Sequence, residues 1–226
     1  AAKLRRYQEM IEEYISDEMQ GLYGAVADAG GNMNKLDASE FPVLNMLNTR
    51  YFIFPLQGGQ TAPLPNPFAL GNAWFVDEVQ YVSNANEEIE AIHGLNPQQT
   101  AVVDKKFESI VKSIPSDAMD TIELVAYEPN YLKYEVDSKK GGTVVFSEIY
   151  YPDWQSTIDG QEAAHGRANY ILRAMNVPAG KHVVEFRFDP KSLHTTETIA
   201  FIALGLLALL AVVVIVMKIK AWRKVG

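Results

Sequence analysis

Hydrophobic and polar side chains alternate with a period of two along the second half of the chain. The alternation recurs in the segments 121–126, 132–136, 154–158 and 184–188, and two further predicted strands at 143–149 and 169–177 complete the pattern. A period of two is typical of strands that bury one face. The dipeptide Asp159-Gly160, which lies between two of these segments, is a strong hairpin signal. Residues 120–191 are therefore predicted to form an antiparallel, jelly-roll-like β-sandwich.

Residues 1–119 follow no single period and are predicted to form a small mixed α/β region, so that the fold class is α+β. Apolar side chains recur at helical spacing over residues 3–19, and this helix is expected to end in a glycine-bearing stretch that contains Gly21, Gly24, Gly30 and Gly31. Shorter helices are predicted at 39–47 and 86–92. Strands are predicted at 51–54, where we expect burial, and at 74–82 and 100–103. Residues 55–71, which are rich in proline, are predicted to be an irregular connection.

The segment Ile199–Met217 contains nineteen residues without a charged or strongly polar side chain. A helix rises about 1.5 Å per residue, so this segment would span roughly 28 Å, close to the thickness of a bilayer's hydrocarbon core. We therefore predict a transmembrane helix over residues 198–218. The alternative is a buried core helix, which the uninterrupted apolar run and the basic residues after it disfavour.

Basic residues gather at one end of this predicted span. The flank is formed by Lys218, Lys220, Trp222, Arg223 and Lys224. By the positive-inside rule the tail 219–226 is expected to be cytoplasmic and residues 1–197 extracytoplasmic, with Trp222 at the interface. The first residues carry no export signal, so we expect either a processed chain or the C-terminal part of a longer membrane protein. The second alternative is favoured, because an earlier transmembrane helix would deliver the domain to the outer side.

The charge distribution excludes one class of partner. All 28 acidic residues precede residue 198, together with sixteen of the twenty basic ones, so this part of the chain carries a net charge of −12. Nucleic-acid binding requires a basic face, so no nucleic-acid partner is expected. The chain contains no cysteine. Disulfides, thiol nucleophiles and cysteine-based metal sites are therefore excluded.

Motifs for catalysis are scarce. The four histidines show no metal-ligand spacing, and the chain lacks the glycine-rich and nucleophile motifs of nucleotide-binding proteins and hydrolases. We therefore assign no metal site, no cofactor and no catalytic residue. One weak alternative is a hydrolase that uses the carboxylates Glu148 and Asp153, with Asp159 nearby, since paired carboxylates serve glycosidases. Strand and turn positions explain these three residues more simply.

Three aromatic side chains, Tyr150, Tyr151 and Trp154, cluster beside a predicted turn. Sugars stack on tyrosine and tryptophan rings, and the guanidinium of Arg167 could bind a neutral or anionic glycan. These four residues are the candidate carbohydrate-binding residues. The alternative is that the aromatic rings anchor the core, because Trp154 alternates in phase with Ile158.

Five segments of the chain together resemble one family. They are Ala2–Ile11 (AKLRRYQEMI), Val43–Phe54 (VLNMLNTRYFIF), Asn66–Val82 (NPFALGNAWFVDEVQYV), Gly141–Gly160 (GGTVVFSEIYYPDWQSTIDG) and Arg167–Pro190 (RANYILRAMNVPAGKHVVEFRFDP). In this order they resemble the C-terminal extracytoplasmic region and last transmembrane helix of YfhO-like bacterial membrane proteins, and the resemblance covers nearly the whole chain.

The resemblance implies a GT-C-type glycosyltransferase of the bacterial cytoplasmic membrane. Such an enzyme is expected to move a sugar from a polyprenyl-phosphate carrier to a cell-envelope glycan or polymer on the outer side. Its catalytic acid would lie among N-terminal transmembrane helices that this chain does not contain. The expected partners are therefore the lipid bilayer, those missing helices or partner membrane subunits, an envelope glycan and a lipid-linked sugar.

Two functions from different classes follow. In the first, the chain is a non-catalytic extracytoplasmic portion of a membrane glycosyltransferase. In the second, it is a membrane-tethered interaction or carbohydrate-binding accessory module without transferase activity. An upstream reading frame with many apolar spans would favour the first, and a complete gene that begins at Ala1 would favour the second. A single helix cannot enclose a polyprenyl phosphate, so transfer would require further membrane helices.

Overall fold

The computed structural model describes residues 4–55 and 59–222. The chain separates into two compact units, Ala1–Arg187 and Phe188–Gly226. The first unit contains the β-sheets and the shorter helices, and the second is built on one long helix. The α+β class that the sequence predicts is confirmed, with mostly antiparallel strands and a C-terminal apolar helix.

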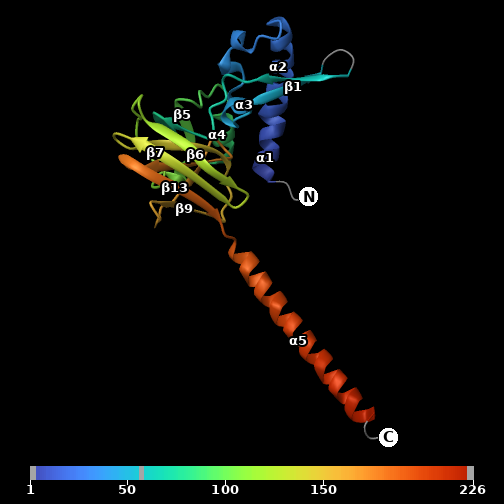
Figure 1. Ribbon diagram of the computed structural model, residues 1–226. Helices are drawn as coiled ribbons and strands as arrows, with labels where there is room; N and C mark the ends of the chain where they lie inside the picture. The colour runs from blue at the N-terminus through green and yellow to red at the C-terminus, as the bar shows by residue number, and fades with distance from the viewer. Residues whose placement is uncertain (1–3, 56–58, 223–226) are drawn as a thin grey trace. The chain divides into compact units, whose positions relative to one another are not determined.

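Two antiparallel sheets form the centre of the first unit (Figure 1). The five-stranded sheet has the order β10-β9-β13-β7-β6, with bounds Gln161–Glu162, Trp154–Ile158, Gly180–Phe188, Tyr131–Ser138 and Thr121–Glu128. The four-stranded sheet has the order β11-β12-β8-β3, with bounds Gly166–Ala168, Leu172–Val177, Gly142–Ile149 and Ala73–Val76. The predicted hairpin is confirmed, because β9 pairs with β10 across Asp159-Gly160.

The two sheets face each other across an aromatic core. Tyr134 of β7, Phe146 of β8 and Phe186 of β13 are fully buried, and their rings meet edge to face with centroids 4.9–6.2 Å apart. Aliphatic side chains from β7, β8, β12 and β13 fill the space around them. The period-two alternation thus has the cause that the sequence analysis assigns to it, since alternate residues of each strand enter this core.

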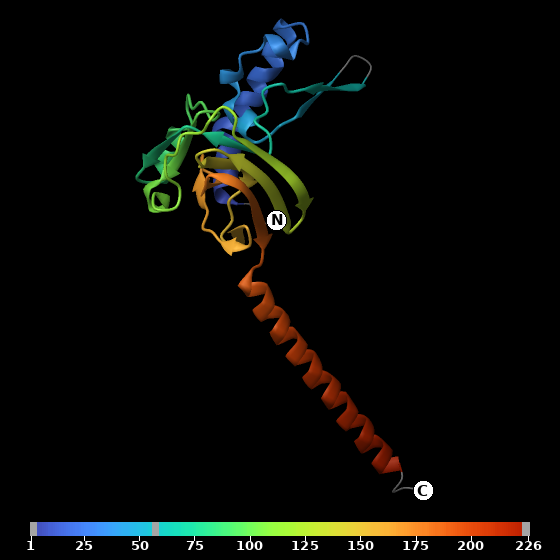
Figure 2. The ribbon, with the colours of Figure 1, turned by 60° about the vertical axis from the view of Figure 1, so that its left-hand side comes forward.

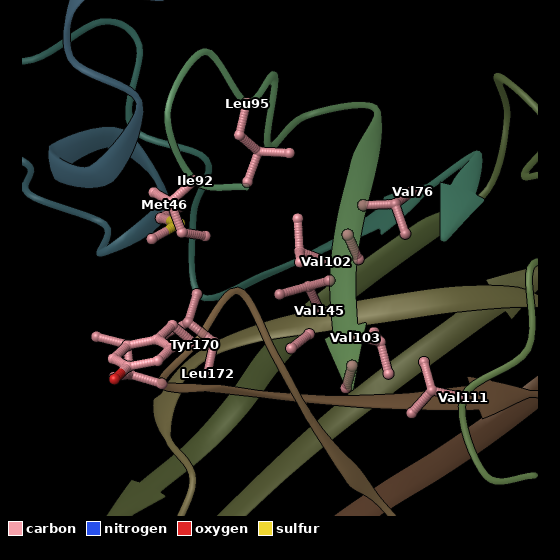
Figure 3. Close-up of a cluster of buried hydrophobic side chains, with 14 of the residues drawn as sticks. Met46, Val76, Ile92, Leu95, Val102, Val103, Val111, Val145, Tyr170 and Leu172 are labelled. Atoms are coloured by element: carbon pink, nitrogen blue, oxygen red, sulfur yellow. The ribbon is translucent and has the colours of Figure 1, made fainter. Parts of the chain in front are cut away.

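A second core covers the other face of the four-stranded sheet (Figure 3). Here β5 (Thr100–Asp104) pairs in parallel with β4 (Glu78–Val82), and both pack with α3 (Pro42–Met46) and α4 (Ala85–Glu90). Strand β8 is therefore buried on both faces, which explains its continuous run of buried residues from 142 to 146. The boundary predicted between residues 119 and 120 falls inside the first compact unit, because β3 pairs with β8. The four-part domain division stays a prediction.

The N-terminal helix is longer than predicted. It runs through α1 (Arg5–Met10), a π-helical turn η1 (Ile11–Ile15) and α2 (Ser16–Asp28) without interruption. Gly21 and Gly24 lie inside the helix, whereas Gly30 and Gly31 end it at positive φ. The amide of Gly31 donates to the carbonyl of Val26 at 2.9 Å, a helix end for which glycine is the preferred residue. Short 3₁₀ turns follow at Met33–Lys35, Ala38–Glu40 and Lys105–Phe107.

Three predicted elements differ in the structure. The strand expected over 74–82 is two strands, β3 and β4, which lie in different sheets. Asp77, between them, belongs to neither strand. The irregular connection expected over 55–71 contains β2 (Thr61–Pro65), which pairs with β1 (Tyr51–Pro55). This ribbon reaches outward in both views (Figure 1, Figure 2), so Tyr51 and Ile53 are 62% and 57% exposed rather than buried.

The second unit is the helix α5, Lys191–Trp222. Its stretch Thr195–Lys220 is long and apolar enough to cross a membrane, with a mean hydropathy of 3.3. The side chains of this stretch are exposed. A soluble core helix of this composition would be covered by other elements. The predicted span 198–218 lies within this stretch.

Candidate glycan-binding surface

The four residues predicted to contact a sugar lie in different surroundings. The side chain of Trp154 is half-buried against the sandwich core, and the guanidinium carbon of Arg173 lies 4.0 Å from its ring centroid. Tyr151 is 39% exposed in the turn before β9. Tyr150 and Arg167 line one pocket together. The four residues therefore do not form a single surface, and their sugar contacts stay a prediction.

The pocket with Tyr150 and Arg167 has a volume of about 220 Å³. One wall comes from the end of β8 and the segments beside β11 and β12, and the other comes from the start of α1. The complete lining is Leu4, Arg5, Arg6, Ile149, Tyr150, Arg167, Tyr170 and Ile171. The volume lies below the range of about 300–1,000 Å³ that is usual for small-molecule sites, so the pocket suits one small group at most.

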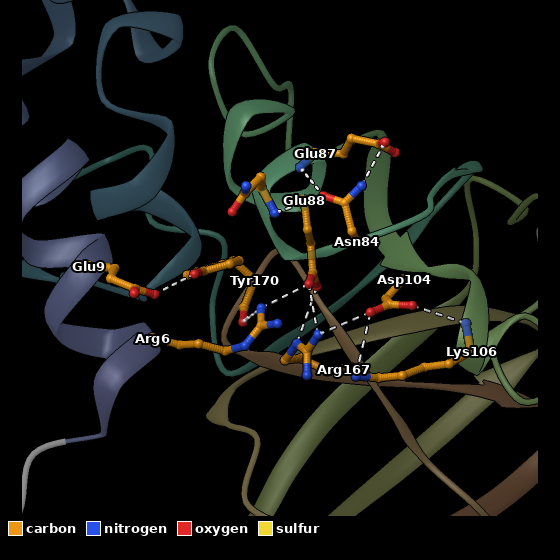
Figure 4. A network of polar contacts seen from close by, with 10 residues as sticks. Arg6, Glu9, Asn84, Glu87, Glu88, Asp104, Lys106, Arg167 and Tyr170 are labelled. Carbon is orange, nitrogen blue, oxygen red and sulfur yellow. Dashed lines mark hydrogen bonds and ion pairs between the residues drawn. The ribbon is translucent and has the colours of Figure 1, made fainter.

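A fully buried carboxylate, Glu88 of α4, binds two of the arginines of this pocket, Arg6 and Arg167 (Figure 4). Arg167 donates to both of its oxygens, from Nε to Oε1 at 3.2 Å and from Nη2 to Oε2 at 2.7 Å. Arg6 donates from Nη1 to the same Oε2 at 2.8 Å. Asp104, which lies 3.7 Å from Arg167, adds a second acidic group. The two hydrogen bonds from Arg167 to Glu88 form a bidentate pair, which is the strong form of an arginine–carboxylate interaction.

A second link joins α1 to the same region through Tyr170. The guanidinium carbon of Arg6 lies 4.3 Å from the Tyr170 ring centroid, and the Tyr170 hydroxyl donates to the Glu9 carboxylate. Burial, together with this bond, raises the pKa of Tyr170 to about 12, and the bond lowers the pKa of Glu9. The charges of Arg6 and Arg167 are thus matched by acidic partners within the fold. This network positions the pocket and joins α1 to the sandwich.

Sequence reasoning missed Arg6, Glu88 and Tyr170, which belong to this network. The only local signal was the acidic first turn of the helix predicted at 86–92, which Asn84 caps by accepting hydrogen bonds from the amides of Asn86 and Glu87. Nothing near Glu88 in the sequence shows that its side chain faces inward toward two arginines from distant segments.

The carboxylates of the alternative hydrolase lie in the local structures that the sequence indicates. Glu148 is in β8, Asp153 is in the turn before β9, and Asp159 has a φ of +51° in the β9–β10 turn. Asp159 accepts hydrogen bonds from the Val183 amide at 2.8 Å and contacts His182 Nδ1 at 2.6 Å. Asp159 therefore stabilises the turn.

His165 also has structural surroundings. His165 Nδ1 lies 2.7 Å from the Ser156 hydroxyl oxygen, and its ring packs on Phe186 with a centroid separation of 5.2 Å. Burial, with the nearby Arg173 charge, lowers the pKa of His165 to about 4. Within residues 4–55 and 59–222 no group of three or more His, Asp or Glu side chains is arranged to hold a metal ion.

The predicted membrane-anchor flank falls at the end of α5. Lys218 and Lys220 are exposed residues of this helix, and Trp222 is its last residue. Arg223 and Lys224 lie outside the described residues. The apolar stretch and the two lysines after it are the arrangement expected of a membrane helix with a basic end.

The fold and α5 define a β-sandwich domain joined to a candidate membrane helix. Residues 93–200 match the model of the family described as bacterial membrane protein YfhO. The resemblance proposed from the sequence is thereby confirmed, and two of its five segments, 141–160 and 167–190, lie inside the matched range. No curated protein and no solved structure matches the chain.

Proposed function

We propose that this chain is the non-catalytic extracytoplasmic portion, with its membrane anchor, of a glycosyltransferase that moves a sugar from a polyprenyl-phosphate carrier to a cell-envelope glycan or polymer. The carrying observation is that the YfhO match runs through the β-sandwich and ends inside α5. One family model therefore covers most strands of the sandwich and the start of α5. A domain joined in this way to a candidate membrane helix is suited to work at the membrane surface.

The chain's own membrane segment argues against an independent transferase. A polyprenyl phosphate carries a charged headgroup, which needs polar groups from several helices around it. Only one candidate membrane span is present among the described residues. Other helices, from a longer chain or from partner subunits, would hold the carrier, while this domain holds the acceptor glycan or covers the donor.

The location in the proposal is the outer face of the bacterial cytoplasmic membrane. The part of the chain before residue 198 has a net charge of −12, and the part after it carries four basic residues and no acidic one. This asymmetry supports an orientation with the basic end in the cytoplasm. Polyprenyl-linked sugars are consumed on the opposite side, where the sandwich would lie.

A transfer assay on native membranes tests the proposal. Membranes from cells with the complete gene and from cells without it are supplied with a labelled sugar on polyprenyl phosphate, and the label in the envelope polymer is measured. We expect the label to disappear with the gene and to return with a plasmid copy. Unchanged transfer without the gene would refute the transferase role and leave the membrane-tethered accessory module.

The intact mass of the native protein gives an independent check. A mass several-fold above the 25.2 kDa of this chain supports a multi-spanning enzyme. A mass near that value contradicts a single-chain transferase.

A further inference from the structure

An open groove lies where the segment 47–51 meets β6 and β8. Its volume is about 640 Å³, within the usual range for small-ligand sites of about 300–1,000 Å³. The groove is distinct from the pocket that contains Tyr150 and Arg167. Its lining combines aromatic, amide, guanidinium and carboxyl groups, among them Tyr51, Tyr127, Asn72, Arg50 and Glu148.

Two tyrosines of the groove present their rings to solvent. Tyr51 of β1 is 62% exposed and Tyr127 of β6 is 67% exposed. Neither hydroxyl forms a hydrogen bond to another of the described residues. Exposed aromatic rings gathered at one hollow are characteristic of binding surfaces, since a ring adds contact area at a low cost in side-chain entropy.

The polar side chains of the groove are held in place and still have free donors. Arg50 donates from Nη2 to Asn72 Oδ1 at 2.7 Å. This bond orients both side chains and leaves Arg50 Nη1 and Asn72 Nδ2 without a hydrogen-bond partner among the described residues. Donors that are oriented before binding lose little entropy when a ligand arrives.

Glu148 supplies a carboxyl group with unused hydrogen-bonding capacity. Its side chain is half-buried, and no described residue donates a hydrogen bond to it. Burial raises the pKa of Glu148, while the charge of Arg173 opposes this effect. Two other buried groups that interact electrostatically with Glu148, the Tyr134 hydroxyl and Arg173 Nη1, also lack hydrogen-bond partners among the described atoms. A ligand hydroxyl that donates a hydrogen bond to Glu148 would supply the partner that this carboxyl group lacks.

We propose that this groove binds an uncharged hexose unit of a glycan. The C–H faces of a pyranose stack on Tyr51 and Tyr127, and its hydroxyl groups bond to the carboxyl group of Glu148 and the free donors of Arg50 and Asn72. The groove holds one carboxyl group, Glu148, and one guanidinium group, Arg50, so its lining has no excess of basic groups that would select an anionic sugar. The binding site stands on the groove itself, and only the identity of the glycan as the transferase's acceptor rests on the proposed function.

Binding of uncharged disaccharides to the full chain in detergent micelles tests this site. Gentiobiose, lactose and chitobiose are titrated by calorimetry, with glucuronic acid as the anionic contrast. We expect at least one neutral disaccharide to bind and Tyr51→Ala and Tyr127→Ala each to weaken that affinity about tenfold. Tyr23→Ala is the matched control, since it removes an exposed tyrosine of α2 that does not line the groove. Unchanged thermal unfolding of each variant shows that the fold is intact.

Several results would overturn the proposal. The first two are no binding of any neutral disaccharide and binding of glucuronic acid alone. The others are an affinity of the Tyr51→Ala and Tyr127→Ala variants equal to that of the unaltered chain, and a loss of affinity in the Tyr23→Ala variant only. Glu148→Gln should weaken binding less than Glu148→Ala, because the amide keeps one acceptor and a donor.

The transfer assay separates this proposal from the proposed function. Transfer that depends on the gene, together with unaltered sugar binding in the tyrosine variants, refutes the groove and preserves the transferase. Sugar binding in the groove without gene-dependent transfer supports the groove and refutes the transferase.

Discussion

Replacement of Glu88 by glutamine tests the energetic role of the network that joins α1, α4 and β11. Glu88 is fully buried and accepts two hydrogen bonds from Arg167 and one from Arg6. Glutamine keeps the shape of the side chain, but it removes the charge and replaces one acceptor by a donor. The guanidinium of Arg167, which is only 7% exposed, then has a single acidic neighbour, Asp104, at 3.7 Å.

The magnitude follows from burial. Removing one partner of a buried ion pair costs about 3–5 kcal/mol, because the remaining charge stays out of water. Asp104 retains part of the compensation, so we expect Glu88→Gln to lower the free energy of unfolding by about 3 kcal/mol. Arg6→Gln is the matched comparison. The Arg6 side chain is 28% exposed, so solvent partly screens its pair and the loss should be about 1 kcal/mol.

Urea unfolding of the full chain in micelles measures both losses. Tryptophan fluorescence provides the signal, since Trp74 is buried in the second core and donates to the Pro97 carbonyl at 2.7 Å. The double variant Glu88→Gln, Arg167→Met should recover most of the stability, because it removes the unpaired charge. A loss below about 1 kcal/mol for Glu88→Gln, or an equal loss for Arg6→Gln, would refute the reasoning.

Three further predictions concern the backbone, the response to pH and the membrane topology. Gly141→Ala should cost about 2 kcal/mol or more in urea unfolding, because Gly141 has a φ of +79° and an added Cβ would lie 2.6 Å from a backbone carbonyl oxygen. Gly30→Ala, at a φ of +64° in open space, should cost only about 1 kcal/mol, and equal losses would contradict the steric argument. The folded-state pKa of His165, about 4, lies below its ordinary value of 6.5, so its contribution to stability is complete above pH 6.5 and is lost as the pH falls toward 4. His165→Gln should reduce this loss of stability at low pH. Parallel curves of unfolding free energy against pH for the two proteins would contradict the role given to His165. Because the chain has no cysteine, Lys139→Cys should react with an impermeant maleimide in intact cells and Lys220→Cys only after permeabilisation, whereas the reverse pattern would invert the topology.

The sequence predicts the strands of the sandwich well, because alternation is a local property that burial of one face imposes. It fails at β2, where Pro63 and Pro65 argue against a strand. Both prolines lie in a two-stranded ribbon, paired with Ile53 and Tyr51. A residue without an N–H is tolerated where no third strand needs its donor. Tertiary context therefore overrides the local rule.

The candidate site is less accessible to sequence reasoning. Tyr150 and Arg167 do line one pocket, but the role of Arg167 depends on Glu88, which is 79 positions away in the sequence. The groove likewise brings Tyr51 and Tyr127 together from β1 and β6. Such pairs follow from topology, since no local period or motif connects them.

The position of β3 in the four-stranded sheet has a consequence for biogenesis. During synthesis Ala73–Val76 emerges long before its partner β8, and the sheet cannot be completed until Gly142–Ile149 has followed. The exposed strand must therefore wait in an unpaired state, and closure of the sandwich depends on a contact of large sequence separation, which slows folding. A fragment cut at residue 120 would leave one edge of β8 bare and prone to association. Recombinant work on the sandwich should therefore retain the preceding segment from β3 onward.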